Sequence, residues 1–490
     1  MTEPHRPHRI VVAGGGITGL VAARRLAQAG HEVTVVEQAG RLGGQVHTMR
    51  LGSRWVDVGA EALHLGAPPG RHLVEELGLV DTVVGSRPGP SWLWTGRGLR
   101  ALPAGFTPSG PTRLRPVATS GVMSVRGLSR AGLEPIVARV RPALAPDEDV
   151  SVGEFVSGRF GSEVTQRFID PLLGSLHAGD VHRLSLRACA PGLVDAATHR
   201  RSLVRRRPMP SAPTAHRGSP PALPMFATWP EGLRTLTDAL LTDLPVTVRL
   251  GSRVRRLTVT PAGYTVEVSD ATGTGEQLSV DAVVLALPAG AAAPLIAHHS
   301  PRAAGILEDV EVAKVATVVL GFDRAATKPL RAFGGTGVLL PSTSGMVLKA
   351  ATHLSRKWPQ FAEDHSCLVR LSAGRSGDDR LEELTDDELV RQLVAEYRTV
   401  TGLDAPAEVL HVQRWSDGLP QLRVGHQARL ATLREELAHA LPRVVVAGSA
   451  YEGLGLASCI ASGEAAAAAL ALPVGRSGAT DGATDRAVRA

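Results

Sequence analysis

Apolar and polar residues follow distinct periods along the chain, and the N-terminal part shows the clearest pattern. Residues 11–13, VVA, are apolar and mostly β-branched, as in a strand that is buried on both faces. A glycine-rich turn and a long helical pattern follow, and a second strand pattern, HEVTVVE, ends at Glu37. This order predicts a strand–turn–helix–strand unit built on a parallel sheet.

Similar apolar runs return late in the chain. Residues 280–290, VDAVVLALPAG, predict another buried parallel strand, and residues 443–472 predict a strand, a glycine-rich turn and a helix. Between residues 244 and 270 the apolar positions alternate, which predicts strands at the edge of a sheet. The most apolar run, residues 282–297, contains prolines and is too short to span a membrane, so we interpret it as a strand and a turn.

The middle of the chain has a helical pattern. Val164, Phe168 and Leu172 recur at positions i, i+4 and i+8, which places them on one helix face. We interpret this stripe as core rather than as a substrate site. Ser151 and Glu154 have the spacing of a capping box and predict the start of a helix.

The glycines of the first unit fit a dinucleotide site. Gly14, Gly16 and Gly19 form G-x-G-x-x-G between the expected strand and helix, and Glu37 lies where an acid would bind ribose hydroxyls. The glycines permit a tight turn and let the backbone and helix N-terminus approach a pyrophosphate. A glycine-rich turn in an ordinary α/β protein is the alternative. The residues expected to bind the dinucleotide here are Gly14, Gly16, Ile17, Thr18, Gly19, Glu37 and Gln38.

Composition and charge exclude several classes of function. The 490 residues are too many for one small core, so two or more domains are expected. The net charge is only +6, and no basic helix is interleaved with aromatic residues, so we expect no nucleic-acid partner. The scattered cysteines show no metal-ligand spacing and suit a reducing compartment, and nothing resembles a signal peptide. We therefore expect a cytoplasmic protein without a metal.

A second glycine cluster indicates which dinucleotide binds. Arg41, Gly43 and Gly44 follow the acid closely and resemble the Gly-Gly doublet of the FAD-containing amine oxidase superfamily. A plain turn would be the better interpretation of the two glycines if Glu37 did not precede them. The resemblance implies FAD as the cofactor, with its AMP ribose held by Glu37. It also implies FAD contacts at Gly59, Ala60, Val254, Gly448, Gly455 and Leu456, with Val254 near the adenine.

Further motifs, spread over almost the whole chain, resemble the oxygen-dependent protoporphyrinogen oxidase family with its Gram-positive coproporphyrinogen III oxidase branch. The most diagnostic is PLLGSLHAGD, at residues 171–180. Others are GRGLRALPAG, FATWPEGLRTL, GTGVLLPST, QRWSDGLPQLRVGH and AGSAYEGLGLASCIASGEAAA. His177 of this chain stands where that family usually has an aromatic residue.

The resemblance implies an α/β fold, α+β overall, in which a discontinuous FAD-binding domain of the two-dinucleotide type accompanies a mixed-sheet substrate domain and a helical subdomain. The expected boundaries are 1–85, 225–292 and 410–474 for the FAD-binding domain, 86–110 and 293–409 for the substrate-binding domain, 111–200 for the helical subdomain, 201–224 for a mobile loop and 475–490 for a disordered tail.

The resemblance also implies the reaction. Six hydrogens would leave a porphyrinogen in three two-electron steps, and molecular oxygen would accept the electrons and yield hydrogen peroxide. The flavin carries this chemistry, so no catalytic acid/base dyad is required and none is proposed. Coproporphyrinogen III is favoured over protoporphyrinogen IX as the substrate in heme biosynthesis. The candidate substrate residues are His177, Gly179 and Tyr451.

Other interpretations remain open at this point. An amine oxidase or desaturase relative would share the FAD fold, although only Tyr451 offers an aromatic ring in the closing motif. A protein that keeps the fold without catalysis would have no need of Glu37, Gly43 and Gly44. Beyond the tetrapyrrole and oxygen, the partners considered are a membrane, through peripheral contact, and other heme-pathway enzymes, through transient hand-off.

Overall fold

The fold is described from a computed structural model. The structure describes residues 7–103, 106–107, 110–111, 114–204, 223–328, 331–362 and 366–471. Most of the expected mobile loop (201–224) and all of the expected tail (475–490) lie outside the described residues. Within the described part, no helix is long and apolar enough to cross a membrane.

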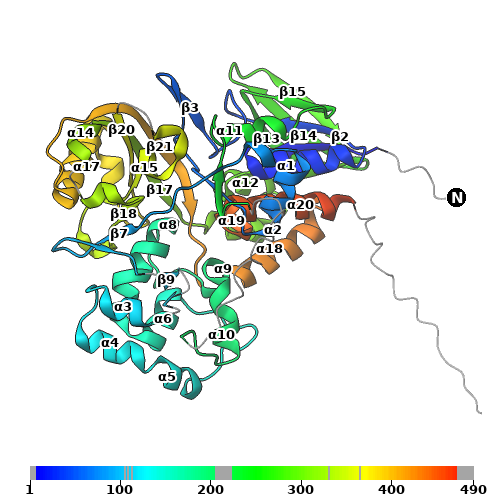
Figure 1. The fold of residues 1–490 in the computed structure, drawn as a ribbon. Helices are drawn as coiled ribbons and strands as arrows, with labels where there is room; N and C mark the ends of the chain where they lie inside the picture. Colours follow the sequence, from blue (N-terminus) through cyan, green and yellow to red (C-terminus); the bar gives the residue numbers. More distant parts are fainter. Residues whose placement is uncertain are drawn as a thin grey trace, which may run out of the picture.

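A five-stranded parallel sheet is assembled from distant segments of the chain (Figure 1). Its strand order is β12-β2-β1-β16-β22. The strands are β1 (Arg9–Ala13), β2 (Glu32–Val36), β12 (Val246–Arg249), β16 (Ala282–Leu285) and β22 (Val444–Val446). The register pairs Val11 with both Thr34 and Val283, so β1 lies at the centre. The expected parallel strands are therefore present.

Both faces of this sheet are covered, which explains why its strands are apolar throughout. Helices α1 (Ile17–Gln28) and α20 (Leu456–Ala471) pack on one face, in a cluster that contains Val12 and Val284. Val11 and Val283 face the opposite cluster. That cluster also involves β13 (Ser252–Thr260), β14 (Gly263–Asp270), β15 (Gly275–Val280), α12 (Ala289–Ile296), α13 (Pro301–Glu308) and α18 (His426–Ala440).

The segment after β16 differs from the expectation. The apolar run at residues 282–297 was expected to be a strand and a turn, but after β16 the chain forms helix α12. The alanines of this segment have the strongest intrinsic helix preference, and Ala292 and Ala293 are fully buried against the sheet. Pro294 is accommodated inside this short helix.

A seven-stranded mixed sheet forms a second body, with strand order β21-β17-β20-β19-β18-β7-β8. Its strands are β7 (Ser91–Trp94), β8 (Leu99–Ala101), β17 (Val312–Asp323), β18 (Gly337–Leu339), β19 (Leu348–His353), β20 (Ser366–Ala373) and β21 (Glu408–Pro420). Helix α17 (Asp386–Thr401) packs on one face through Leu389, Leu393 and Tyr397. Short helices α14 (Arg324–Thr327), α15 (Leu354–Lys357) and α16 (Arg380–Glu383) contact its inner strands β17, β19 and β20.

Helices from the middle of the chain form a third part, drawn below the two sheets in Figure 1. They are α3 (Leu114–Thr119), α4 (Val125–Gly132), α5 (Glu134–Val140), α6 (Val152–Phe160), α7 (Ser162–Val164), the π-helix (Thr165–Gly174), α8 (Ser175–His177), α9 (Leu186–Cys189) and α10 (Val194–Thr198). Val164 and Phe168 are fully buried in the core of this part, as the periodicity predicted.

Smaller elements join these parts. They are β3 (Thr48–Leu51), β4 (Arg54–Asp57), β5 (Leu63–His64), α2 (Pro68–Glu76), β6 (Val84–Gly85), β9 (Phe106–Thr107), β10 (Gly110–Pro111), β11 (Phe226–Thr228), α11 (Arg234–Ala239) and α19 (Ser449–Glu452). β3 and β4 form an antiparallel hairpin between the parallel sheet and the seven-stranded sheet. This mixed α/β architecture agrees with the fold class expected from the sequence.

Candidate functional site

The turn after β1 can form only with glycine at two positions. Gly14 has a φ of +105°, and a Cβ there would collide with the carbonyl oxygen of Ala286 on the neighbouring segment. A Cβ on Gly19 would collide with the carbonyl oxygen of Gly14. The Gly14 amide donates to Val36, at 2.8 Å. The turn is therefore closed tightly, and α1 begins directly behind it without a side-chain cap.

Glu37 lies at this turn, at the end of β2. Its carboxylate accepts hydrogen bonds from the amides of Gly15 and Ala39, each at 2.7 Å. The backbone of Glu37 is itself fixed, because its amide donates to Arg249 at 2.9 Å and its carbonyl accepts from Ser252 at 2.9 Å. These contacts hold the acid beside the glycine turn, while the next residue along the chain, Gln38, is exposed.

The second glycine cluster touches the first. The Gly43 amide donates to the Gly15 carbonyl at 2.8 Å, and a Cβ on Gly44 would lie 3.0 Å from the Gly16 Cα. Arg41 is turned back on this loop, where it donates to the Gly44 carbonyl at 2.8 Å. Burial lowers the pKa of Arg41, an effect that the nearby carboxylate of Glu37 opposes.

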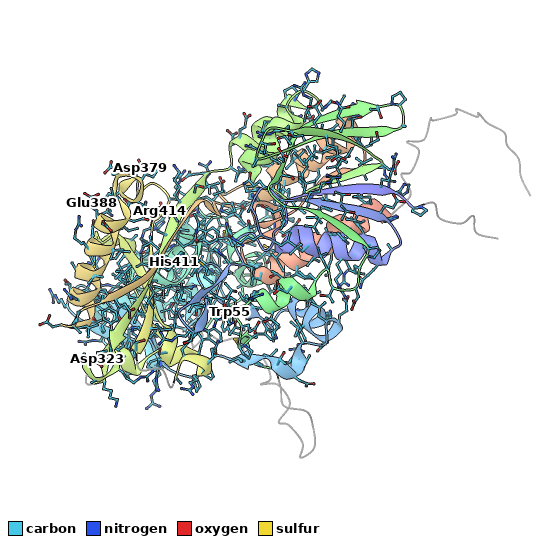
Figure 2. The ribbon with its side chains drawn as sticks, turned by 90° about the horizontal axis from the view of Figure 1, so that it is seen from above. Trp55, Asp323, Asp379, Glu388, His411 and Arg414 are labelled. Carbon is cyan, nitrogen blue, oxygen red and sulfur yellow. The ribbon has the colours of Figure 1, made fainter. Side chains whose placement is uncertain are left out.

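Besides the two glycine clusters, the segment of Gly59 and Ala60, just after β4, also packs closely against other backbone. The Ala60 amide donates to the Gln45 carbonyl at 2.9 Å. A Cβ on Gly59 would collide with the same carbonyl and would lie 3.0 Å from Cζ2 of Trp415 on β21. This position therefore lies where the loops of the parallel sheet meet the seven-stranded sheet. Figure 2 labels Trp55 of β4 and His411 of β21, both to the left of the parallel sheet in that view.

The segment from β22 to the start of α20 contains the last expected cofactor residues. Gly448, with a φ of +134°, follows β22, and its amide donates to Oγ of Ser462 at 3.0 Å. Gly455 and Leu456 mark the start of α20. Leu456 packs against the same apolar cluster as Ile17 of α1, so the two helix starts adjoin.

Val254 and Thr18, two further expected cofactor residues, lie outside the glycine loops. Val254 lies on β13 and is buried in the same apolar cluster as Val36, the residue before Glu37. Thr18 lies in the first turn of α1, where α20 comes so close that a Cβ on Gly463 would be 2.5 Å from the Thr18 carbonyl oxygen. The expected cofactor residues thus come from separate segments of the chain that lie between Glu37, at the end of β2, and the start of α20.

The candidate substrate residues fall into two places. His177 and Gly179 lie after the π-helix, where Nε2 of Gln421 donates to the His177 carbonyl at 2.9 Å and a Cβ on Gly179 would collide with Oε1 of the same glutamine. Burial lowers the pKa of His177 to about 4, and its Nδ1 has no partner among the described residues. Tyr451 lies on α19, and no hydrogen bond joins it to His177 within the described chain.

Tyr451 is 3% exposed, and its hydroxyl also lacks a partner in the described part of the chain. Burial raises the pKa of this hydroxyl, so it stays protonated. The backbone beneath it is fixed because the His426 ring donates from Nε2 to the Tyr451 carbonyl at 2.9 Å. Two buried polar groups, Nδ1 of His177 and the Tyr451 hydroxyl, therefore remain available for a ligand among the described residues.

A charged cluster beside Gly59 was not expected from the sequence. Glu61 accepts from Lys357 at 2.7 Å and also pairs with Arg370, which in turn donates to the Gly59 carbonyl at 2.9 Å. Burial would raise the pKa of Glu61, but Arg370 and Lys357 outweigh it and hold the pKa at about 2. This network fixes the loop of Gly59 on the seven-stranded sheet.

The pKa of Asp57, at the end of β4, shifts in the opposite direction. Asp57 accepts hydrogen bonds from Thr48 at 2.5 Å and from the Leu233 amide at 3.0 Å. Burial nevertheless raises its pKa to about 7, since these bonds and Arg370 offset only part of the desolvation. Asp57 and Glu61 had no motif of their own, because most of their partners, such as Leu233, Lys357 and Arg370, lie far away in the sequence.

Two further cations, Lys349 and Arg375, also escaped the sequence analysis. Lys349 is buried on β19, and Arg375 follows β20. One signal could have identified Lys349, because lysine is rare in this chain and occurs at residues 314, 328, 349 and 357 alone. A lysine inside a strand pattern of such a sequence is unusual.

The geometry fits an extended dinucleotide cofactor. At Gly14, Gly19, Gly43 and Gly59 a Cβ would collide with backbone or nearly so, so the loops come together only because these residues lack side chains. Uncapped amides at the start of α1 favour an anion such as a pyrophosphate. Glu37 stands where ribose hydroxyls would bind.

Comparisons with known proteins agree with this geometry. The family model described as flavin containing amine oxidoreductase matches residues 17–471. A coproporphyrinogen III oxidase of Bacillus subtilis is 31% identical over 93% of this chain and 96% of its own length. One from Mycobacterium leprae is 32% identical over 95% and 98%. A crystal structure from Exiguobacterium sp. 255-15, provisionally named protoporphyrinogen oxidase, has a TM-score of 0.81 at 26% identity and covers 95% of this chain and 99% of that one.

Proposed function

The chain belongs to the family of flavin-containing amine oxidoreductases, and from this premise we propose that it oxidises coproporphyrinogen III to coproporphyrin III, with FAD as cofactor and molecular oxygen as electron acceptor. One observation carries the proposal: two proteins named coproporphyrinogen III oxidase, from different bacterial genera, are similar to this chain over more than nine-tenths of its length. The motifs that first suggested this family lie throughout that region.

FAD is favoured over a smaller flavin by the extent of the glycine-lined stretch. Glu37 would bind the AMP ribose, and the turn from Gly14 to Gly19 would hold the pyrophosphate. Gly43 and Gly44 would lie along the same part of the cofactor, and Gly59 would lie near its ring. We propose that all the cofactor residues expected from the sequence contact FAD. They are Gly14, Gly16, Ile17, Thr18, Gly19, Glu37, Gln38, Arg41, Gly43, Gly44, Gly59, Ala60, Val254, Gly448, Gly455 and Leu456.

The chemistry balances with this cofactor. Three two-electron steps remove six hydrogens from the macrocycle and reduce three molecules of oxygen to hydrogen peroxide. A bound flavin supplies the hydride acceptor for each step. The protein's own residues hold protons: the His177 ring is neutral, and the Tyr451 hydroxyl keeps its proton, because both are buried. Either could donate a hydrogen bond to the substrate.

Further parts of the proposal concern the setting. We propose that the parallel-sheet body binds FAD and that the seven-stranded sheet and helical part complete the substrate site, as the expected domain boundaries state. The three cysteines form no disulfide, which supports a reducing compartment and so the cytoplasm. We also propose transient hand-off of the product to other heme-pathway enzymes.

The decisive experiment supplies both porphyrinogens separately. We expect the purified protein to turn reduced coproporphyrinogen III into fluorescent coproporphyrin under air, with added FAD required once the flavin has been removed. Protoporphyrinogen IX should react more slowly. Turnover of protoporphyrinogen IX with none of coproporphyrinogen III would reject the substrate, and a yellow protein inactive on both would reject the reaction while leaving the cofactor.

A further inference from the structure

Lys349 is a buried cation that lacks an anionic partner. Its residue is 5% exposed on β19. Its ammonium makes no hydrogen bond or ion pair with any residue that the structure describes, and the charged groups that act on it are themselves cations. An unpaired buried ammonium costs several kcal/mol, so such groups normally meet a carboxylate, a ligand or an acceptor cluster.

The neighbours of Lys349 show which way it faces. Leu348 and Ala351 pack toward α17 on one side of the seven-stranded sheet. A bulge between Leu348 and Ala350 leaves Lys349 unpaired in the ladder of β19 with β20. Arg370 acts on Lys349, and the Arg370 guanidinium reaches the Gly59 carbonyl on the side of the sheet away from α17. Lys349 therefore faces the junction where the cofactor loops meet the sheet.

Arg375 adds a second cation to the same place. Its Nη2 donates to the Leu340 carbonyl at 2.8 Å, and the Leu340 amide donates to the Lys349 carbonyl at 3.0 Å. Nε and Nη1 of Arg375 are buried and find no partner among the described residues. Asp170 is the buried carboxylate that acts on Arg375, and it already accepts a hydrogen bond from the Ser342 amide at 2.7 Å. Lys349 and Arg375 together therefore exceed the nearby buried negative charge.

The turn that carries His177 is fastened over this pair. Oγ of Ser175 donates to the Lys349 carbonyl at 3.3 Å, and the Ser376 amide donates to the Ala178 carbonyl at 2.7 Å. Ala178 adopts a φ of +47°, a conformation that non-glycine residues rarely take outside tight or functional turns. The π-helix before it is likewise a form that occurs mostly at functional sites.

We propose that Lys349 and Arg375 form a carboxylate-binding subsite, which receives one propionate of the tetrapyrrole. This rests on the proposed function for the identity of the ligand. The ammonium and the two unbonded guanidinium nitrogens supply the donors that a carboxylate needs, and the ligand's charge compensates the two cations. A substrate with more propionates has more ways to place one here, which suits coproporphyrinogen.

The subsite should respond to pH. Burial first, and then Arg375 and Arg370, lower the pKa of Lys349 to about 7. A bound carboxylate favours the charged ammonium, so binding takes up a proton above pH 7 and weakens by up to about tenfold per pH unit there. The charged groups that act on the pair are Arg370, Asp170 and Asp378. The other titratable groups nearby are His177, on the turn held by Ser175, and Glu396 of α17, which accepts from the Leu348 amide at 2.7 Å.

The test is a fluorescence titration of the FAD-loaded protein with the product coproporphyrin III and with its tetramethyl ester, which carries no carboxylate. Lys349→Met and Arg375→Met should each weaken coproporphyrin III binding about tenfold or more at pH 6.5 and leave ester binding unchanged. Lys349→Arg should keep the affinity and lose the decline above pH 7. Lys314→Met, which removes an exposed lysine paired with Glu382 on the same sheet, is the matched control and should change nothing.

The outcomes separate the two proposals. If the native protein oxidises coproporphyrinogen III while Lys349→Met retains native affinity for coproporphyrin III, the subsite is overturned and the function stands. An equal loss of ester and acid binding would also overturn it, because the role would then be structural. If the native protein neither oxidises the porphyrinogen nor binds the porphyrin, the function falls and the subsite with it. Should Lys349→Met fail to fold, an unchanged pH profile in Lys349→Arg overturns the subsite by itself.

Discussion

At the scale of single residues, the glycine turn makes the sharpest demand on the sequence. Gly14→Ala would place a methyl group against the Ala286 carbonyl at a φ of +105°. We expect a loss of about 3 kcal/mol in the free energy of unfolding and a protein that purifies without bound flavin. Flavin absorbance and urea unfolding measure the two effects.

Gly40 offers the matched control, since it lies in the same loop region and a Cβ there meets nothing within 4 Å. Gly40→Ala should keep both flavin and stability. A Gly14→Ala protein that retains native flavin content would contradict the assignment of this turn to the cofactor.

Asp57 gives a prediction about pH. Its pKa in the folded protein is about 7, above the usual 3.8, because burial disfavours the charged form. The folded state therefore holds a proton that the unfolded state has released, and this stabilising contribution is present below pH 3.8 and lost as the pH rises toward 7. Asp57→Asn cannot ionise and should escape that loss.

Between pH 5 and pH 7 the free energy of unfolding of the native protein should therefore fall by about 2 kcal/mol relative to Asp57→Asn. Urea unfolding at the two pH values measures this difference. Asp81→Asn, which changes an exposed carboxylate, should follow the native protein at both. Parallel pH profiles for the native protein and Asp57→Asn would show that the carboxyl is ionised in the fold throughout.

At the scale of elements, α4 and α5 present an unusual surface. Val125, Ile136 and Val140 are 82%, 62% and 75% exposed, and Arg126 and Arg139 are exposed among them. Apolar side chains beside arginines suit the interface of an anionic membrane. We predict that the protein sediments with vesicles containing an anionic lipid and that Ile136→Asp combined with Val140→Asp weakens this at least about tenfold.

Val259→Asp is the control for that experiment. Val259 is 50% exposed on β13, in the parallel-sheet body drawn far from α5 in Figure 1. It should bind vesicles as the native protein does. Absence of vesicle binding by the native protein, or equal binding by the double variant, would remove the membrane from the list of partners.

Some elements could be predicted from local patterns because their partners are implied by the pattern itself. The apolar strands around Val11 and Val283 required burial on both faces, and Ser151 begins α6 by accepting from the Glu154 amide at 3.0 Å. The helix α12 was missed because its prolines indicated a turn while its alanines and burial favoured a helix. The π-helix was missed because its apolar spacing also fits an α-helix.

The candidate site divides in the same way. The glycines and Glu37 follow one another in a motif whose spacing carries the geometry, so they could be named from the sequence. Lys349 and Arg375 come together only through the pairing of β19 with β20 and the position of the segment after β18. Such pairing depends on long-range register, which a single sequence does not state. The assignment of the cofactor and substrate residues remains a prediction for the experiments above.

At the scale of the whole molecule, the cofactor would join segments that the chain keeps far apart. The proposed contacts run from Gly14 to Ala60, recur at Val254 and resume at Gly448, and the strands beneath them come from three separate regions. A ligand that binds only the folded arrangement stabilises it by about 2.7 kcal/mol when its concentration is 100 times its dissociation constant. FAD should therefore stabilise the assembled fold rather than one loop.

We accordingly predict that the melting temperature of flavin-free protein rises by several degrees with the logarithm of the FAD concentration, and that flavin release coincides with the unfolding reported by tryptophan fluorescence. The buried Trp229 and Trp358 report on different apolar clusters, so a coincident transition would mean that these clusters unfold together. Glu37→Gln should need at least about tenfold more FAD for the same shift, because an amide accepts ribose hydroxyls less strongly than a carboxylate. Glu32→Gln, at an exposed position of β2, should need no more than the native protein. A melting temperature independent of FAD would mean that the cofactor does not bind across these segments, and the glycine-lined stretch would then require another ligand.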